Sequence, residues 1–252
     1  MNDYDAFAEV YDLFYGDFTA DLEMYLGFAE RTAGPILEIG AGTGRVALAL
    51  AEAGHDVVGL EPSAAMRARA QQKADRAQLA DRTRFVPGDM RRFKIDQHFG
   101  LIVAPLNTFL HNLTLDDQLA TLRSIRPQLR PGGLLVLDCF NPDPAHAFDD
   151  HALTLQRAQL DPATGTASLL YVSRTVDWAA QQQENVYIAE RPGSDGGFQR
   201  LAMMTQFRFI FPHEMPLLLK LGGFNLKEVY GSYDLDPFEA GSEQLIAVAA
   251  PA

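Results

Sequence analysis

The sequence has little of several features that define common protein classes. Cys139 is the only cysteine among 252 residues, so neither an intramolecular disulfide nor a cysteine-based metal site can form, and no metal is expected. No apolar run approaches the roughly 20 residues that a membrane-spanning helix needs. The N-terminal residues have neither the basic nor the apolar segment of a signal peptide. We therefore expect a cytoplasmic protein with no membrane partner.

Positive charge is also scarce. The chain has 21 Lys and Arg residues against 33 Asp and Glu, a net charge of -12. Proteins that bind nucleic acids or anionic membranes neutralise phosphate groups with basic side chains. The acidic balance therefore predicts no nucleic-acid partner, and its simplest consequence is solubility. A hydrophobic content of 47% is enough for one sizeable core.

Short apolar segments alternate with helical patterns in the first half of the chain. The intervening patterns are typical of helices, including one expected over residues 115–129, and Pro131-Gly132-Gly133 is expected to be a turn. Strands that alternate with helices in this way form a parallel sheet through right-handed crossovers. The predicted strands cover residues 36–39, 56–60, 83–86, 100–104 and 134–140.

The flanking segments differ in pattern. Residues 4–30 show apolar side chains at helical spacing, interrupted at Gly16. Residues 141–153 are rich in Pro and Asp and are expected to be a connection. Residues 168–211 are rich in β-branched and aromatic residues between turn signals, which predicts three antiparallel strands. A helix over 213–221 and strands over 224–230 and 244–249 are expected to follow.

A glycine-rich loop, ILEIGAGTGR, joins the first predicted strand to the next helix. Its glycines are Gly40, Gly42 and Gly44, which give the spacing G-x-G-x-G. The dinucleotide fingerprint G-x-G-x-x-G has its third glycine where this chain has Arg45, and no Gly-Lys-Ser/Thr follows to make a phosphate-binding P-loop. The spacing therefore disfavours a pyrophosphate ligand.

Acidic residues accompany the loop. Glu38 precedes the first glycine, Glu61 ends the second predicted strand, and Asp89 follows the third. The carboxyl ends of parallel strands meet at one rim of the sheet, which is where such folds bind ligands. A row of carboxylates would repel a pyrophosphate and attract a ligand that carries hydroxyls, amines and a positive centre.

Four ordered segments resemble a known family. ILEIGAGTGR, VVGLEPS, FVPGDM and LRPGGLLVLDCF are similar to the successive motifs of class I S-adenosylmethionine-dependent methyltransferases. The resemblance is close over 34–140 and loose over 224–249. It implies an α/β fold: a Rossmann-like, doubly wound, seven-stranded sheet with an N-terminal helical lid and a small antiparallel β insertion after strand 5. The implied parts are the lid (1–33), the cofactor-binding core (34–140), the insertion (141–212) and the C-terminal helix with closing strands (213–252).

The resemblance also assigns the cofactor contacts for S-adenosyl-L-methionine. Glu38 supports the loop and receives the cofactor's amino group, Glu61 accepts both ribose hydroxyls, and Asp89 accepts the adenine amino hydrogen. The helix after the loop offers its N-terminus to the carboxylate. Met66 has the alternative role of a core residue. The implied contacts are Tyr11, Tyr15, Glu38, Gly40, Ala41, Gly42, Gly44, Arg45, Glu61, Pro62, Met66, Asp89, Met90 and Leu106.

The methyl acceptor has candidate residues in three places. The N-terminal helix resembles the entry helix of small-molecule methyltransferases. After the fourth strand, Asn107 and Thr108 are candidate acceptor contacts, and His111 is the candidate base because histidine titrates near neutrality. In the antiparallel block, Arg174, Trp178, Tyr187 and Arg208 could line a pocket. A structural role for His111, and a homodimer contact for the antiparallel sheet, are the alternatives.

The sequence therefore predicts a methyltransferase that acts on a small-molecule N or O acceptor by direct in-line transfer. The N-P-P-Y motif of DNA amino methylation is absent, since the corresponding segment reads Ala-Pro-Leu-Asn. Quinone-type and lipid acceptors stay open. Arg45 and Asp89 disfavour a nicotinamide dehydrogenase. A different group transferase on the same scaffold and a non-catalytic cofactor-binding protein remain alternatives.

Overall fold

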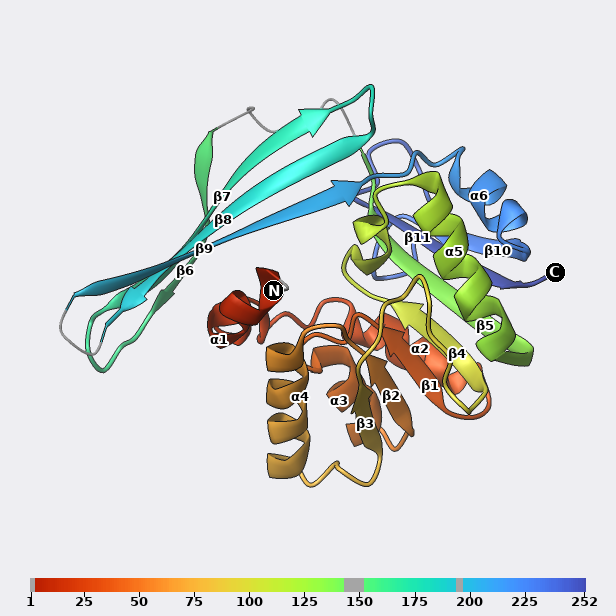
Figure 1. Ribbon diagram of the computed structural model, residues 1–252, viewed down its shortest axis with the longest axis horizontal. Coiled ribbons are helices and arrows are strands. Elements are labelled where there is room, and N and C mark those ends of the chain that lie inside the picture. Colours follow the sequence, from red (N-terminus) through yellow and green to blue (C-terminus); the bar gives the residue numbers. More distant parts are fainter. Residues whose placement is uncertain (1–2, 143–151, 194–196) are drawn as a thin grey trace.

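The computed structural model describes residues 3–142, 152–193 and 197–252, which form two sheets. The larger sheet has seven strands in the order β10-β11-β5-β4-β1-β2-β3, and the smaller has four in the order β6-β7-β8-β9 (Figure 1). The strands of the larger sheet are β1 (Ile36–Ile39), β2 (Val57–Leu60), β3 (Thr83–Val86), β4 (Phe99–Ala104), β5 (Leu129–Phe140), β10 (Phe224–Tyr230) and β11 (Gln244–Pro251).

The larger sheet confirms the doubly wound fold. β1 to β5 are parallel, while β11 runs antiparallel between β5 and β10. The helices α2 (Leu22–Glu30) and α3 (Arg45–Glu52) pack on one face, and α5 (Leu115–Ile125) and α6 (Met215–Leu221) pack on the other. Every residue of β1, β2 and β4 is buried, as strands covered on both faces should be.

Two boundaries differ from those expected from the sequence. The helix predicted over 115–129 ends at Ile125, and a 3-10 turn, η2 (Arg126–Gln128), follows it. Pro127 explains the early end, because a proline has no N–H and cannot continue the helical hydrogen bonds. The turn expected at Pro131-Gly132-Gly133 is instead part of β5, which already begins at Leu129 and pairs there with Phe99.

The smaller sheet has one strand more than the sequence predicted. The expected strands are β7 (Ala167–Asp177), β8 (Gln182–Pro192) and β9 (Phe198–Arg208). The additional strand is β6 (Leu153–Leu160). Its apolar alternation stops after Leu155, because a bulge between Leu155 and Arg157 shifts the register, and nearly all of its residues are exposed. The predicted connection over 141–153 lies mostly outside the described residues.

The helix α1 (Asp3–Tyr15) lies between the smaller sheet and α4 (Ala64–Arg76) (Figure 1). Phe7, Val10 and Phe14 are buried against apolar residues of the smaller sheet. Toward the larger sheet, Asp5 accepts hydrogen bonds from the Ser63 hydroxyl and the Ala65 N–H at the start of α4. α1 is therefore held on both sides. In the described part of the chain no helix is long and apolar enough to span a membrane.

Candidate cofactor and acceptor site

A cavity of about 280 Å³ lies at the carboxyl ends of β1, β2 and β4. This is the edge at which open α/β sheets bind ligands. The structure brings together here most of the residues expected to bind the cofactor. The lining includes Tyr11, Glu38, Gly40, Ala41, Gly42, Arg45, Glu61, Pro62, Met66, Met90 and Leu106, and it adds Tyr4, Thr43, Val46, Pro105, Thr108 and His111.

The three loop glycines have different roles, although each has a positive φ. A Cβ on Gly42 would meet nothing within 4 Å, so the loop backbone leaves open space there. A Cβ on Gly40 would lie 2.5 Å from Thr108 Cγ2. A Cβ on Gly44 would lie 3.0 Å from the Phe85 ring, and Gly44 is not among the residues that line the cavity. Gly44 therefore serves packing of α3, while Gly42 leaves room for a ligand.

Glu38 is a buried carboxylate in this cavity. Its side chain is 3% exposed and accepts a hydrogen bond from the Ala47 N–H, while no described residue hydrogen-bonds to Oε2. Burial, partly opposed by the charge of Arg45, raises the pKa of Glu38 to about 8. A buried carboxylate oxygen needs a partner to offset its lost hydration. The site therefore fits a ligand with a cationic amino group.

Arg45 lines the cavity but is held by α2 and the segment before it. Its guanidinium donates two hydrogen bonds to Asp21, at 2.5 and 2.6 Å, and a third to the Phe18 carbonyl at 2.9 Å. Asp21 is fully buried. The sequence reasoning did not find Asp21, because the two residues are 24 positions apart and nothing in the pattern links them. This bidentate pair fixes the start of α3 against the N-terminal segment.

Glu61 connects the glycine loop with the next loop. Its carboxylate accepts the Gly42 N–H at 2.9 Å and the Ser63 N–H at 2.8 Å. Burial raises the pKa of Glu61, and the two backbone hydrogen bonds act in the opposite direction. Met66, which follows on α4, is 1% exposed and also lines the cavity, so its core role and its site role coexist.

Besides Gly44, two residues expected at the cofactor, Asp89 and Tyr15, lie outside the lining. Asp89 accepts hydrogen bonds from the Arg91 guanidinium, the shortest at 2.6 Å, and its neighbour Met90 reaches the cavity instead. Tyr15 stacks on Tyr11 with ring centroids 5.0 Å apart. The position of Arg91 in the sequence could have indicated that Asp89 is not free for the cofactor, because a basic residue two positions after an acidic one can form an ion pair with it.

A second cavity, of about 630 Å³, lies between the inner face of the smaller sheet and the ends of β4 and β5. Arg174, Trp178 and Tyr187 line it from the smaller sheet, and Asn107 lines it from the segment after β4, so the structure brings these four candidate acceptor contacts together. Aromatic and amide side chains complete it. These are Phe140, Phe207, Phe209, Asn141, Gln183 and Asn185, with Pro142, Val176, Gly241, Ser242 and Glu243 at its border.

Two of the expected acceptor contacts are elsewhere. Arg208 donates hydrogen bonds to Gln118 at 2.6 Å and to Glu214 at 3.1 Å, on the face of β9 opposite to Phe207. Successive side chains of a strand point to opposite faces, so Phe207 lines the cavity and Arg208 does not. The expectation for Arg208 is therefore wrong. Thr108 lines the first cavity, near the glycine loop, rather than the second.

His111 lies where the two cavities approach each other. It belongs to the 3-10 turn η1 (Thr108–His111), and its ring centroid is 4.7 Å from that of Phe207, which lines the second cavity. The Tyr4 hydroxyl lies 3.3 Å from Nε2 of His111. Burial lowers the pKa of His111 to about 4. The imidazole is therefore neutral at pH 7 and has a nitrogen lone pair.

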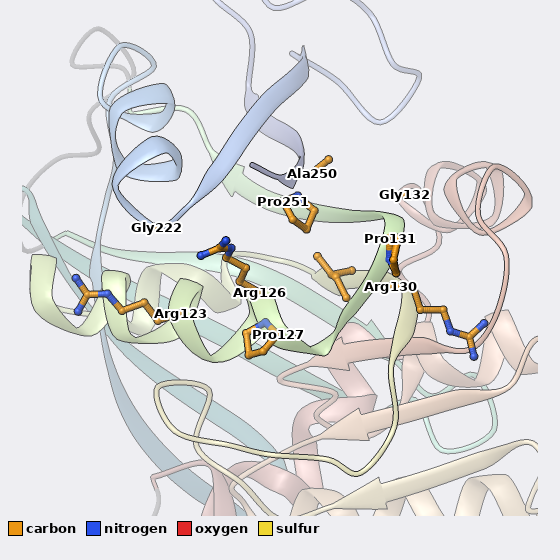
Figure 2. A pocket seen from close by; sticks show the side chains of 10 residues that line it. Arg123, Arg126, Pro127, Arg130, Pro131, Gly132, Gly222, Ala250 and Pro251 are labelled. Carbon is orange, nitrogen blue, oxygen red and sulfur yellow. The ribbon is translucent and has the colours of Figure 1, made fainter.

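A third cavity, also of about 630 Å³, lies at the opposite edge of the larger sheet, where β5 begins and β11 ends. Figure 2 shows its arginines, of which Arg123 and Arg130 extend in opposite directions and Arg126 points toward Gly222. Arg130 donates to the His98 carbonyl. The guanidinium groups do not converge, so this cavity is not a built anion site.

Comparison with known proteins identifies the domain. Residues 36–133 match the family model described as a methyltransferase domain. The cypemycin N-terminal methyltransferase of a Streptomyces species is 29% identical over 84% of this chain and 81% of its own length. The structure of the CcbJ methyltransferase from Streptomyces caelestis superposes with a TM-score of 0.86 at 26% identity, covering 100% of this chain and 98% of that one.

More distant structures show the same fold. The sugar N-methyltransferase KedS8 from a Streptoalloteichus species covers 95% of this chain and 92% of its own, with a TM-score of 0.75 at 20% identity. The match of residues 36–133 to the methyltransferase-domain model, together with these methyltransferase relatives, identifies the chain as an S-adenosylmethionine-dependent methyltransferase of the class I type.

Proposed function

We propose that this enzyme methylates a small-molecule acceptor, an amine in the first place, where the two cavities meet. The observation that carries the proposal is the segment after β4, because Leu106 lines the cofactor cavity and the adjacent Asn107 lines the second cavity. S-adenosylmethionine supplies a sulfonium methyl group for direct transfer to a nucleophile. In-line transfer needs close approach of the two reactants, and two adjoining cavities favour that approach.

In this proposal, different residues of the first cavity bind different parts of the cofactor. Glu38 pairs with the amino group through its unpartnered oxygen. Glu61, already aligned by the Gly42 and Ser63 amides, accepts the ribose hydroxyls. Pro62, Met66 and Met90 surround the adenine, since they line the same cavity. Asp89 would reach the adenine amino group only after leaving Arg91.

The second cavity suits an acceptor with apolar and hydrogen-bonding parts. Phe209 and Trp178 are in edge contact, with ring centroids 5.2 Å apart, and Asn185 supplies a fully buried amide. One related protein is named an N-terminal methyltransferase, and two structural neighbours are named a sugar N-methyltransferase and a glycopeptide N-methyltransferase, which supports nitrogen over oxygen. His111 is neutral at pH 7 and can accept a hydrogen bond from the acceptor, while its lowered pKa makes it a weak base, so it orients the amine rather than storing its proton.

The test is a methylation assay with matched amine and hydroxyl acceptors. We expect S-adenosylhomocysteine formation and an acceptor heavier by one methyl group with amines, and less product after Trp178→Ala. Leu217→Ala, which changes a side chain that is 64% exposed on α6, is the control. Cofactor binding without turnover on any acceptor would favour the non-catalytic alternative. A product heavier by a different group would favour another transferase.

The outer face of the smaller sheet offers a place for the predicted homodimer contact. Leu155, Tyr171 and Ile188 are register partners across β6, β7 and β8, and they point away from the second cavity. Leu155 is 54% exposed and Met204, in the next row, is 48% exposed. Apolar patches of this kind commonly mark protein contacts. We propose that two copies stack these faces, and Leu155→Glu should then convert a dimer to a monomer in analytical ultracentrifugation.

A further inference from the structure

The segment between the two cavities has an unusual backbone. Leu106 and Asn107 are adjacent non-glycine residues with φ angles of 45° and 66°. Side chains rarely adopt this left-handed region, and such conformations persist only where the surrounding structure enforces them. Because strained backbone gathers at functional sites, the groups that enforce it are of interest.

The enforcing groups come from β5. The Leu106 N–H donates to Asp138 Oδ2 at 3.0 Å, and the Asn107 N–H donates to the Asp138 carbonyl at 2.9 Å. The Phe140 N–H donates to Asn107 Oδ1 at 2.6 Å. Two residues of one strand thus fix both left-handed residues through backbone and side-chain contacts.

Asp138 is itself held rigidly. It is 1% exposed and lies on the face of β5 that α2 covers, where the Tyr25 hydroxyl donates to Oδ2 at 2.9 Å. The Tyr233 hydroxyl approaches the same oxygen at 3.4 Å. No described residue hydrogen-bonds to Oδ1. A buried carboxylate with an oxygen left over costs stability, so stability alone does not explain an acid at this position.

We propose that Asp138 is a positioning residue for methyl transfer. This inference rests on the function proposed above. Asp138 holds the Leu106–Asn107 segment so that the acceptor in one cavity faces the cofactor in the other. The carboxylate does not line either cavity and acts through the segment. Small displacements of positioning groups lower turnover strongly, because in-line transfer tolerates little misalignment.

The experiment compares Asp138→Ala and Asp138→Asn with the wild type, using the amine acceptor. Asp138→Ala is expected to lower kcat at least about tenfold, with the affinity for S-adenosylhomocysteine kept within about threefold. Asp138→Asn retains an oxygen that can accept the Leu106 N–H, so it should recover part of kcat. Cys139→Ala is the control, because Cys139 is fully buried on the opposite face of β5 and should leave kcat unchanged.

The outcomes separate the two proposals. Wild-type protein without turnover on any acceptor would refute the proposed function. Wild-type turnover with an unchanged kcat in Asp138→Ala, or an equal loss in Cys139→Ala, would refute only the positioning role. If Asp138→Ala does not fold, Tyr25→Phe removes the hydroxyl that orients Asp138, and a fall in kcat with retained S-adenosylhomocysteine affinity is again expected. An unchanged kcat in Tyr25→Phe and Asp138→Asn would overturn the role.

Discussion

We predict that Glu38 makes cofactor binding depend on pH. Burial raises the pKa of its carboxyl to about 8, so in the ligand-free protein it is mostly protonated at pH 7. The unfolded chain would release this proton near the ordinary value of 4.5. Between these two pH values the folded, ligand-free protein binds more protons, so its free energy of unfolding falls as the pH rises. The cationic amino group of a bound cofactor, placed beside Glu38, would favour the ionised carboxylate over the protonated form.

The magnitude follows from the fraction of Glu38 that is ionised. With a pKa of about 8, that fraction is about 1% at pH 6 and about 25% at pH 7.5. If only the ionised form pairs with the ligand's ammonium group, the affinity for S-adenosylhomocysteine should rise roughly 20-fold across this interval, or about 2 kcal/mol. Binding near pH 7 should release most of one proton from Glu38.

Isothermal titration calorimetry with S-adenosylhomocysteine, in buffers of different ionisation enthalpy, measures both quantities. Glu38→Gln should remove the rise in affinity and the proton release. Glu52→Gln, which changes an exposed carboxylate on α3, should leave both as in the wild type. The same affinity at pH 6 and pH 7.5, with heats that do not depend on the buffer, would refute the pairing of Glu38 with the amino group.

Three further predictions concern other residues of the site. Glu61→Ala removes acceptors for the ribose and the loop, each worth about 1.5–3 kcal/mol, so we expect at least a tenfold weaker affinity for S-adenosylhomocysteine by calorimetry; an unchanged affinity would remove the ribose assignment. His111 stays neutral above about pH 4. His111→Ala should therefore lower kcat without changing the pH at which the rate falls on the acid side. A fall in the wild-type rate near pH 6.5 that disappears in the variant would contradict the lowered pKa. Gly44→Ala should destabilise the fold by about 1–3 kcal/mol in urea unfolding, more than Gly54→Ala, where the φ is also positive but a Cβ meets nothing within 4 Å.

The central sheet could be predicted from the sequence, because the patterns that indicate its strands and loops are local. The strand before the glycine loop and Glu38 lie within ILEIGAGTGR, and Glu61 lies within VVGLEPS. Parallel topology then brings the ends of these two strands together. β6 does not follow from the sequence, because a bulge after Leu155 interrupts its apolar alternation after only three residues. The sequence also does not show on which face of β9 Arg208 lies, because that depends on the strand register, which the sequence alone does not set.

Long-range partners account for the rest. Asp21 fixes Arg45, and Tyr25 fixes Asp138, across 24 and 113 positions of the chain. Neither contact follows from spacing or composition. Asp138 is part of LRPGGLLVLDCF, which was recognised as a motif. In the structure Asp138 accepts a hydrogen bond from the Leu106 N–H in the segment after β4. The sequence does not show this contact, because only the fold brings the two residues together.

The double attachment of α1 has a kinetic consequence. Tyr4 and Tyr11 close the cofactor cavity from this helix, while Phe7 and Phe14 belong to the apolar cluster under the smaller sheet. Any motion of α1 that opens the cavity must therefore disturb the sheet that lines the acceptor cavity. Departure of S-adenosylhomocysteine and exchange of the acceptor are then not independent events, because both depend on the position of α1.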